Sequence, residues 1–184
     1  DQFRDYILGF IFFKYLSEKI HLYADDLLKE DGLKYDQISE STPEGRQYID
    51  AIKHAALNKL GYFLMPSELF HVIAAKGKAK TGDDEENETR QSNFILEELA
   101  AVLKHIEQST TGTDSEDDFG NLFEDLDLTS TKLGKTEKEK NAVIAKVLGH
   151  LDDIDFNLSD SKADVLGDAY EYLIGQFASG ASKK

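Results

Sequence analysis

Two short stretches carry residue types that could bind a nucleotide or a metal ion. Gly134-Lys135-Thr136 matches the end of a phosphate-binding loop, but that loop needs a glycine five residues earlier, where this chain has Thr129. Residues 153–159 (DIDFNLS) place oxygen atoms at alternate positions, as a calcium loop does. A calcium loop also needs glycine at its sixth position and glutamate at its twelfth, where Leu158 and Asp164 stand. We therefore expect a loop or turn leading into a helix at both places.

Other catalytic arrangements are missing from the sequence. No two of the five histidines stand four residues apart with a glutamate between them, so there is no zinc-protease motif. A Gly-x-Ser-x-Gly turn and a glycine-rich dinucleotide turn are also absent. The chain has no cysteine, which excludes thiol nucleophiles, thiolate zinc sites and disulfides. The sequence thus predicts no catalytic residue, no cofactor-binding residue and no metal ligand.

The charge balance argues against strong nucleic-acid binding by the chain alone. It has 21 basic and 36 acidic residues, a net charge of -15, and such a chain repels phosphate at long range. Direct DNA contact would need a local basic face. Two lysine clusters are the candidates: Lys76, Lys78 and Lys80 form the best one, and Lys132, Lys135, Lys138 and Lys140 the second.

The elements that would position these side chains are mainly helices. Apolar residues make up 40% of the chain, and they recur at three- and four-residue steps in the segment from about residue 2 to residue 30. Asp31-Gly32 should end this helix, and Thr42-Pro43 should start the next, which ends at Gly61. We expect a helical bundle, with residues 62–65 (YFLM) as a candidate strand of one short strand pair.

Later helix boundaries follow from capping residues. Pro66 should open a short helix, Ser92 should cap a helix that runs through Ile106, and residues 76–91 should form a polar surface loop. Thr136 and Glu139 form a candidate capping box. Further boundaries are Gly149 as the end of that helix and Ser161 as the cap of the last one.

The two ends and the most apolar stretch bear on localisation and domain organisation. Residues 6–16 are too short to span a bilayer and contain Gly9 and Lys14, so we expect a soluble protein with no membrane partner. The absence of cysteine is consistent with a cytoplasmic protein. The chain begins with Asp1 and closes on small residues, which suggests part of a longer protein. We expect a helical domain at 1–177 and the start of a linker at 178–184.

Four stretches resemble one protein family. They are DYIL with IFFKYLS (residues 5–17), YFLMPSELF (62–70), FEDLDL with Leu133-Gly134 (123–134), and DVLGDAYEYLIGQFA (164–178). In this order they resemble the N-terminal part of the modification (M) subunit of type I restriction-modification systems. Each is weak alone, but together they span nearly the whole chain and are specific.

The resemblance implies a role in adenine-N6 DNA methylation. The family's cofactor is S-adenosylmethionine, and its partners are a specificity (S) subunit, a second M subunit, a restriction (R) subunit and double-stranded DNA. Its glycine-rich cofactor loop and its Asn-Pro-Pro-aromatic motif should lie downstream, because this chain has only Pro43 and Pro66 and no Pro-Pro pair. The resemblance therefore implies subunit assembly and closure on DNA, and it carries no catalytic residue over.

The last predicted helix offers candidates for contacts with the rest of such a protein. Tyr170, Tyr172 and Phe177 are these interdomain candidates. Tyr170 and Tyr172 are two positions apart, so both cannot face a helical core squarely. The alternative is that both are partly buried core residues. For the whole chain, the alternative function is a free-standing helical protein-protein adaptor unrelated to DNA.

Overall fold

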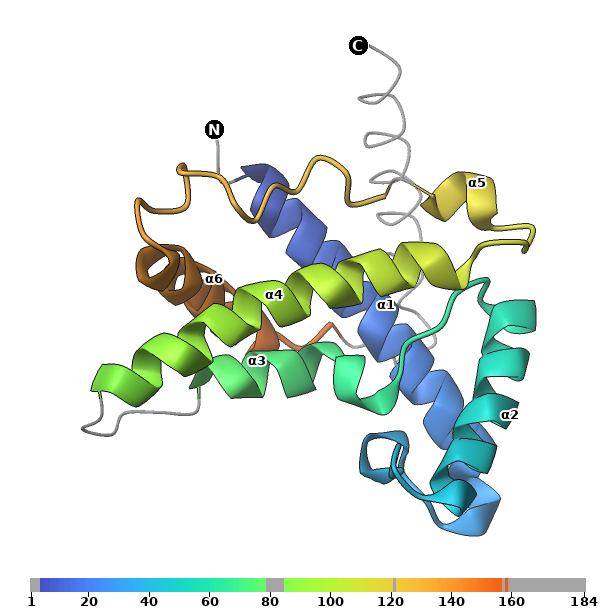
Figure 1. Cartoon of the computed structure of the whole chain (residues 1–184). Coiled ribbons are helices and arrows are strands. Elements are labelled where there is room, and N and C mark those ends of the chain that lie inside the picture. The colour runs from blue at the N-terminus through green and yellow to red at the C-terminus, as the bar shows by residue number, and fades with distance from the viewer. Residues whose placement is uncertain (1–3, 79–84, 121, 157, 159–184) are drawn as a thin grey trace.

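The computed structural model describes residues 4–78, 85–120, 122–156 and 158. This part of the chain is all helical and contains no strand (Figure 1). Its helices are α1 (Arg4–Leu28), α2 (Pro43–Lys59), α3 (Phe70–Lys78), α4 (Glu85–Ser109), α5 (Glu116–Phe119) and α6 (Glu137–Asp152). Single turns of 3-10 helix occur at η1 (Lys29–Asp31), η2 (Tyr35–Gln37) and η3 (Pro66–Glu68). The predicted mainly helical class is confirmed.

The α1 helix is the central element, and α2, α3 and α6 all pack against it. Figure 1 shows α2 and α6 at opposite sides of the molecule, with α4 crossing in front of α1. The side chains of Phe10, Phe13, Leu16 and Ile20 follow one another at helical spacing, and all are 0% exposed. Each such burial contributes roughly 1.5–3 kcal/mol. This apolar face of α1 therefore forms the middle of the core.

Helix ends follow the predicted capping chemistry at three places. Gly32 has a φ of 68°, a left-handed conformation that glycine adopts without strain, and its N–H bonds to the Lys29 carbonyl. The Thr42 side chain accepts the Gly45 N–H at the start of α2, next to Pro43. The Thr136 side chain accepts the Glu139 N–H at the start of α6. These positions confirm the predicted starts of α2 and α6 and the predicted end of the first helical segment.

The α6 helix packs against both α3 and α4. Gly77 of α3 lies at this crossing: a Cβ atom there would be 3.1 Å from Ala145 Cβ of α6 and 3.5 Å from Ile95 Cδ1 of α4. The bare glycine therefore lets three helices approach closely at one point.

The candidate strand at residues 62–65 is wrong, because side chains satisfy its backbone. The Phe63 N–H donates to Ser109 Oγ of α4 at 3.1 Å, and the Met65 N–H donates to Glu68 Oε1 at 2.8 Å. Tyr62, Phe63 and Leu64 are at most 2% exposed. An apolar run can thus be extended and buried without a neighbouring strand.

Three boundary predictions are also wrong. The α4 helix begins at Glu85, so Ser92 lies inside it, and most of the expected loop at 76–91 belongs to α3 or α4. Glutamate, glutamine and arginine are good helix formers, so a helix can continue beyond its apolar stripe. Gly149 lies inside α6, which ends at Asp152. Burial of Leu148 and Leu151 on either side offsets the cost of about 1 kcal/mol for a glycine within a helix.

Candidate functional site

Residues 122–128 pack on the N-terminal half of α1. The Tyr6 hydroxyl donates to the Asp127 carbonyl. The Phe12 and Phe123 rings lie 6.0 Å apart between centroids, and the backbone of Gly9 lies against the Leu126 side chain. Two stretches more than one hundred residues apart in sequence are therefore joined at the core.

Residues 62–70 pack on the next turns of α1. The Tyr62 hydroxyl donates to the Leu16 carbonyl at 2.5 Å, and the Phe70 N–H donates to Ser17 Oγ at 2.7 Å. The Phe13 and Phe70 rings meet edge to face with centroids 5.3 Å apart. The first of the four stretches singled out in the sequence thus contacts both the second and the third, and these contacts fix the core around α1.

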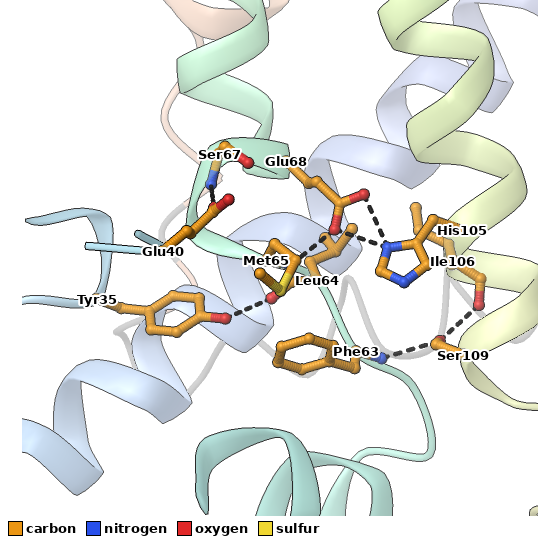
Figure 2. Close-up of polar contacts among 10 residues, drawn as sticks. All are labelled: Tyr35, Glu40, Phe63, Leu64, Met65, Ser67, Glu68, His105, Ile106 and Ser109. Carbon is orange, nitrogen blue, oxygen red and sulfur yellow. Dashed lines mark hydrogen bonds and ion pairs between the residues drawn. The ribbon is translucent and has the colours of Figure 1, made fainter. Parts of the chain in front are cut away.

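An acid–histidine pair fixes the end of the second stretch. Figure 2 shows Glu68 reaching both the backbone of Met65 and the ring of His105 on α4. The His105 Nδ1 atom is 2.7 Å from Glu68 Oε1 and 2.8 Å from Oε2. The hydrogen bond to Glu68 raises the pKa of His105, and partial burial opposes this shift. Because both carboxylate oxygens have partners here, the pair serves to attach η3 to α4.

Lys14 holds the end of α6 against α1. This lysine is 1% exposed, and its Nζ donates to the carbonyls of Leu151, at 2.5 Å, and of Ile154. The same atom lies 3.4 Å from Glu18 Oε1 and 4.5 Å from the centre of the Phe156 ring. A buried ammonium group is thus paired with the carbonyls that end a helix, where positive charge is favourable. Burial raises the pKa of Glu18, and the charge of Lys14 opposes that shift.

Two histidines and two carboxylates meet between α1, η2 and α3. The His21 and His71 rings stack with centroids 5.2 Å apart. Their Nε2 atoms lie 3.9 Å and 3.4 Å from Asp36 Oδ2, and His21 also lies 3.3 Å from Asp25 Oδ2. Burial lowers the pKa of His21, while Asp25 opposes the shift. Within residues 4–158, as far as the structure describes them, no three His, Asp or Glu side chains are arranged to hold a metal ion.

The lysine candidates for DNA contact have different surroundings. Lys76 is exposed but ion-paired with Glu98. Lys132 and Lys135 are exposed, and so is Lys138. Lys140 is only 7% exposed, because its Nζ donates to the Thr129 carbonyl at 2.7 Å. Lys140 therefore fixes the loop before α6, and the exposed lysines of this cluster remain candidates.

The other predicted contact residues fall outside what can be described. The Lys78 side chain and the whole of Lys80 are outside the described residues. So are Tyr170, Tyr172, Phe177 and the predicted boundary at residues 177–178. The role assigned to each of them stays a prediction.

Two shallow grooves border the segment at residues 32–41. The first, about 370 Å³, is lined by Leu22, Asp25, Asp26, Lys29, Leu33 and Lys34. The second, about 290 Å³, is lined by Asp36, Ile38, Glu40, Pro66, Ser67 and Val72. Neither is lined by the Glu68–His105 pair.

No helix in the described part of the chain is long and apolar enough to cross a membrane.

The fold and these contacts define a class of protein: a helical module whose polar pairs join its own elements. Residues 1–151 match the HsdM N-terminal domain family, and the chain belongs to that family. It is 28% identical over 184 residues to the type I restriction enzyme MpnII methylase subunit of Mycoplasma pneumoniae, covering 98% of this chain and 32% of that protein.

A solved structure is similar as well. The chain is 31% identical to the type I restriction-modification system methyltransferase subunit from Streptococcus thermophilus, with a TM-score of 0.65. The match covers 96% of this chain and 34% of that one. The chain therefore spans about a third of the length of the methylase subunits that it resembles.

Proposed function

We propose that this chain is the N-terminal helical domain of a type I restriction-modification methylase subunit, and that it serves subunit assembly and closure of the complex on DNA. In this proposal it holds the specificity subunit and a second methylase subunit, in a complex that also takes a restriction subunit. The observation that carries the proposal is the match of residues 1–151 to the HsdM N-terminal domain family.

Methyl transfer belongs to the rest of the longer protein in this proposal. That part would bind S-adenosylmethionine and methylate adenine at N6 in the cytoplasm, while this domain contributes no catalytic residue. The internal contacts support such a division of labour. Glu68, His105 and Lys14 are all engaged with backbone or side-chain groups of their own domain. A module of this kind can act through the outer faces of its helices.

Contact with DNA would come from the exposed lysines before and at the start of α6. Lys132, Lys135 and Lys138 are exposed within a chain whose net charge is -15. A local basic strip can touch phosphates even when the whole domain is acidic, provided that partner subunits supply most of the attraction. DNA contact is thus proposed for the complex and not for the isolated domain.

The assembly role is tested by the mass of the complex. The longer methylase subunit is purified with its specificity subunit, with and without residues 1–178. The molar mass of each complex is then measured by light scattering during gel filtration. We expect deletion to release free specificity subunit or to lower the methylase content. Retained binding of S-adenosylmethionine by calorimetry shows that the shortened subunit is folded. A complex of unchanged stoichiometry after deletion would contradict the assembly role.

A further inference from the structure

The second groove described above lies between the segment at residues 36–41 and the start of α3. Its apolar walls are Ile38, Pro66 and Val72, and its carboxylates are Asp36 and Glu40. No lysine or arginine lines it. A site of about 290 Å³ lies just below the usual size range of ligand pockets, and it suits one long side chain better than a whole cofactor.

The neighbouring groove differs from this one in the net charge of its lining. Its two carboxylates, Asp25 and Asp26, are accompanied by Lys29 and Lys34, so its lining is neutral. The groove at Ile38 has two carboxylates and no such cations. A positively charged side chain with an apolar stem therefore complements this groove and not its neighbour.

Several contacts hold the groove in shape without a ligand. The Tyr35 side chain is 0% exposed, and its hydroxyl donates to the Leu64 carbonyl at 2.5 Å, as Figure 2 shows. Glu40 Oε1 accepts the Ser67 N–H at 2.8 Å, which joins the two walls. Asp36 Oδ2 lies 3.4 Å from His71 Nε2 and 3.9 Å from His21 Nε2, so the two histidine rings help to position this carboxylate. A preformed site of this kind binds at a lower entropic cost.

We propose that this groove binds an arginine side chain of an extended segment of a partner protein. The methylene stem packs against Ile38 and Val72, and the guanidinium group lies between Asp36 and Glu40. Arginine is preferred to lysine because its planar group can bond two carboxylates and remains charged at all relevant pH values. That the partner is another subunit of the restriction-modification complex rests on the proposed function.

Peptide binding to the chain tests the groove directly. The probe is acetyl-Leu-Arg-Leu-amide, titrated into the isotope-labelled chain at pH 7.5, with amide shifts followed by NMR. The same peptide with citrulline in place of arginine has nearly the same shape but no charge. We expect saturable shifts that centre on Ile38, Ser67 and Val72 with the arginine peptide and only weak shifts with citrulline. Absence of saturable shifts, or equal binding of both peptides, would overturn the proposal.

Charge-removing variants assign the binding to the two carboxylates. Glu40→Gln keeps an oxygen that can accept the Ser67 N–H, and Asp36→Asn is similarly conservative. Each should weaken binding of the arginine peptide about threefold, the size expected for one solvent-accessible ion pair. Asp50→Asn removes an exposed charge from α2 and serves as the matched control. Equal weakening by all three variants would mean diffuse attraction to an acidic surface and would also overturn the proposal.

The two proposals can fail separately. If the peptide does not bind but deletion of residues 1–178 still breaks the complex, the groove assignment is wrong and the assembly role stands. If the peptide binds as described but deletion leaves the complex intact, the groove is real and its partner is a protein outside that complex.

Discussion

Lys14 is the most deeply buried charged side chain among the residues that the structure describes. Its ammonium group donates to two carbonyls where α6 ends, beside Glu18 and the Phe156 ring. In the sequence this lysine only interrupts an apolar stretch, and nothing there shows its partners, which are about 140 residues away. Backbone carbonyls carry no sequence signal, so this contact could not be predicted from residue types.

Replacing Lys14 by methionine should destabilise the chain. Lys14→Met keeps the length of the side chain but leaves the Leu151 and Ile154 carbonyls without their donor, at a cost of about 1–3 kcal/mol. Urea unfolding measures the change in free energy of unfolding. Lys146→Met, at an exposed position of α6, is the control and should change it by less than about 0.5 kcal/mol. Equal or greater stability of Lys14→Met would show that burying the charge costs more than its bonds contribute.

The Glu68–His105 pair should make stability depend on pH. Because Glu68 raises the pKa of His105 above its ordinary value of 6.5, protonation favours the folded state. The extra stability is fully present below pH 6.5 and is lost as the pH rises through the folded pKa. His105→Gln should therefore cost most near pH 6 and progressively less up to pH 8.5. The ring is partly exposed, which limits the effect.

Thermal unfolding of the wild-type chain and of His105→Gln across this pH range measures the dependence. His54→Gln, at an exposed position of α2, provides the matched histidine control. A difference between wild type and His105→Gln that stays constant, or that grows toward alkaline pH, is inconsistent with a charge-assisted bond between His105 and Glu68.

At the scale of elements, the crossing of α3, α4 and α6 depends on a small residue. Gly77→Leu would force the Ala145 and Ile95 side chains to move and should destabilise the chain by about 1–3 kcal/mol. Ala75→Leu, at an exposed position of the same helix, should change stability by less than about 0.5 kcal/mol. Both values come from urea unfolding. If the two substitutions had equal effects, Gly77 would not be a point of close contact between helices.

Helix positions were predictable where apolar periodicity and local capping agree. The start of α2 at Thr42-Pro43 and the start of α6 at Thr136 need only neighbouring residues. Predictions were wrong where residues distant in the sequence determine the local structure. Phe63 and Met65 resemble strand residues, yet Ser109 and Glu68 satisfy their N–H groups. The capping box is only half formed, because Glu139 accepts the Lys135 N–H.

The candidate site was less predictable than the fold. The first stretch singled out by resemblance contacts the second and the third through Tyr6, Phe13 and Tyr62, but this spatial arrangement depends on tertiary packing. Within the second lysine cluster, residue types alone do not distinguish buried Lys140 from exposed Lys132. The Thr129 carbonyl, a backbone group, makes that difference.

For the whole molecule, the net charge of -15 limits the proposed contact with DNA to local basic surfaces. Lys132→Glu with Lys135→Glu in the assembled complex should weaken DNA binding and flatten its salt dependence. Each lost phosphate contact reduces the magnitude of the negative slope of log K against log salt by about 0.9. The control is Lys59→Glu at an exposed position of α2. An unchanged slope after the double substitution would exclude these lysines as phosphate contacts.

We propose that the domain assembles the methylase on DNA and leaves the chemistry to the rest of the protein. The decisive experiment measures methyl transfer to DNA by the longer methylase subunit with its specificity subunit, with and without residues 1–178. We expect deletion to abolish DNA methylation while S-adenosylmethionine binding persists. Unchanged methylation after deletion, or a longer protein that binds no S-adenosylmethionine at all, would contradict it.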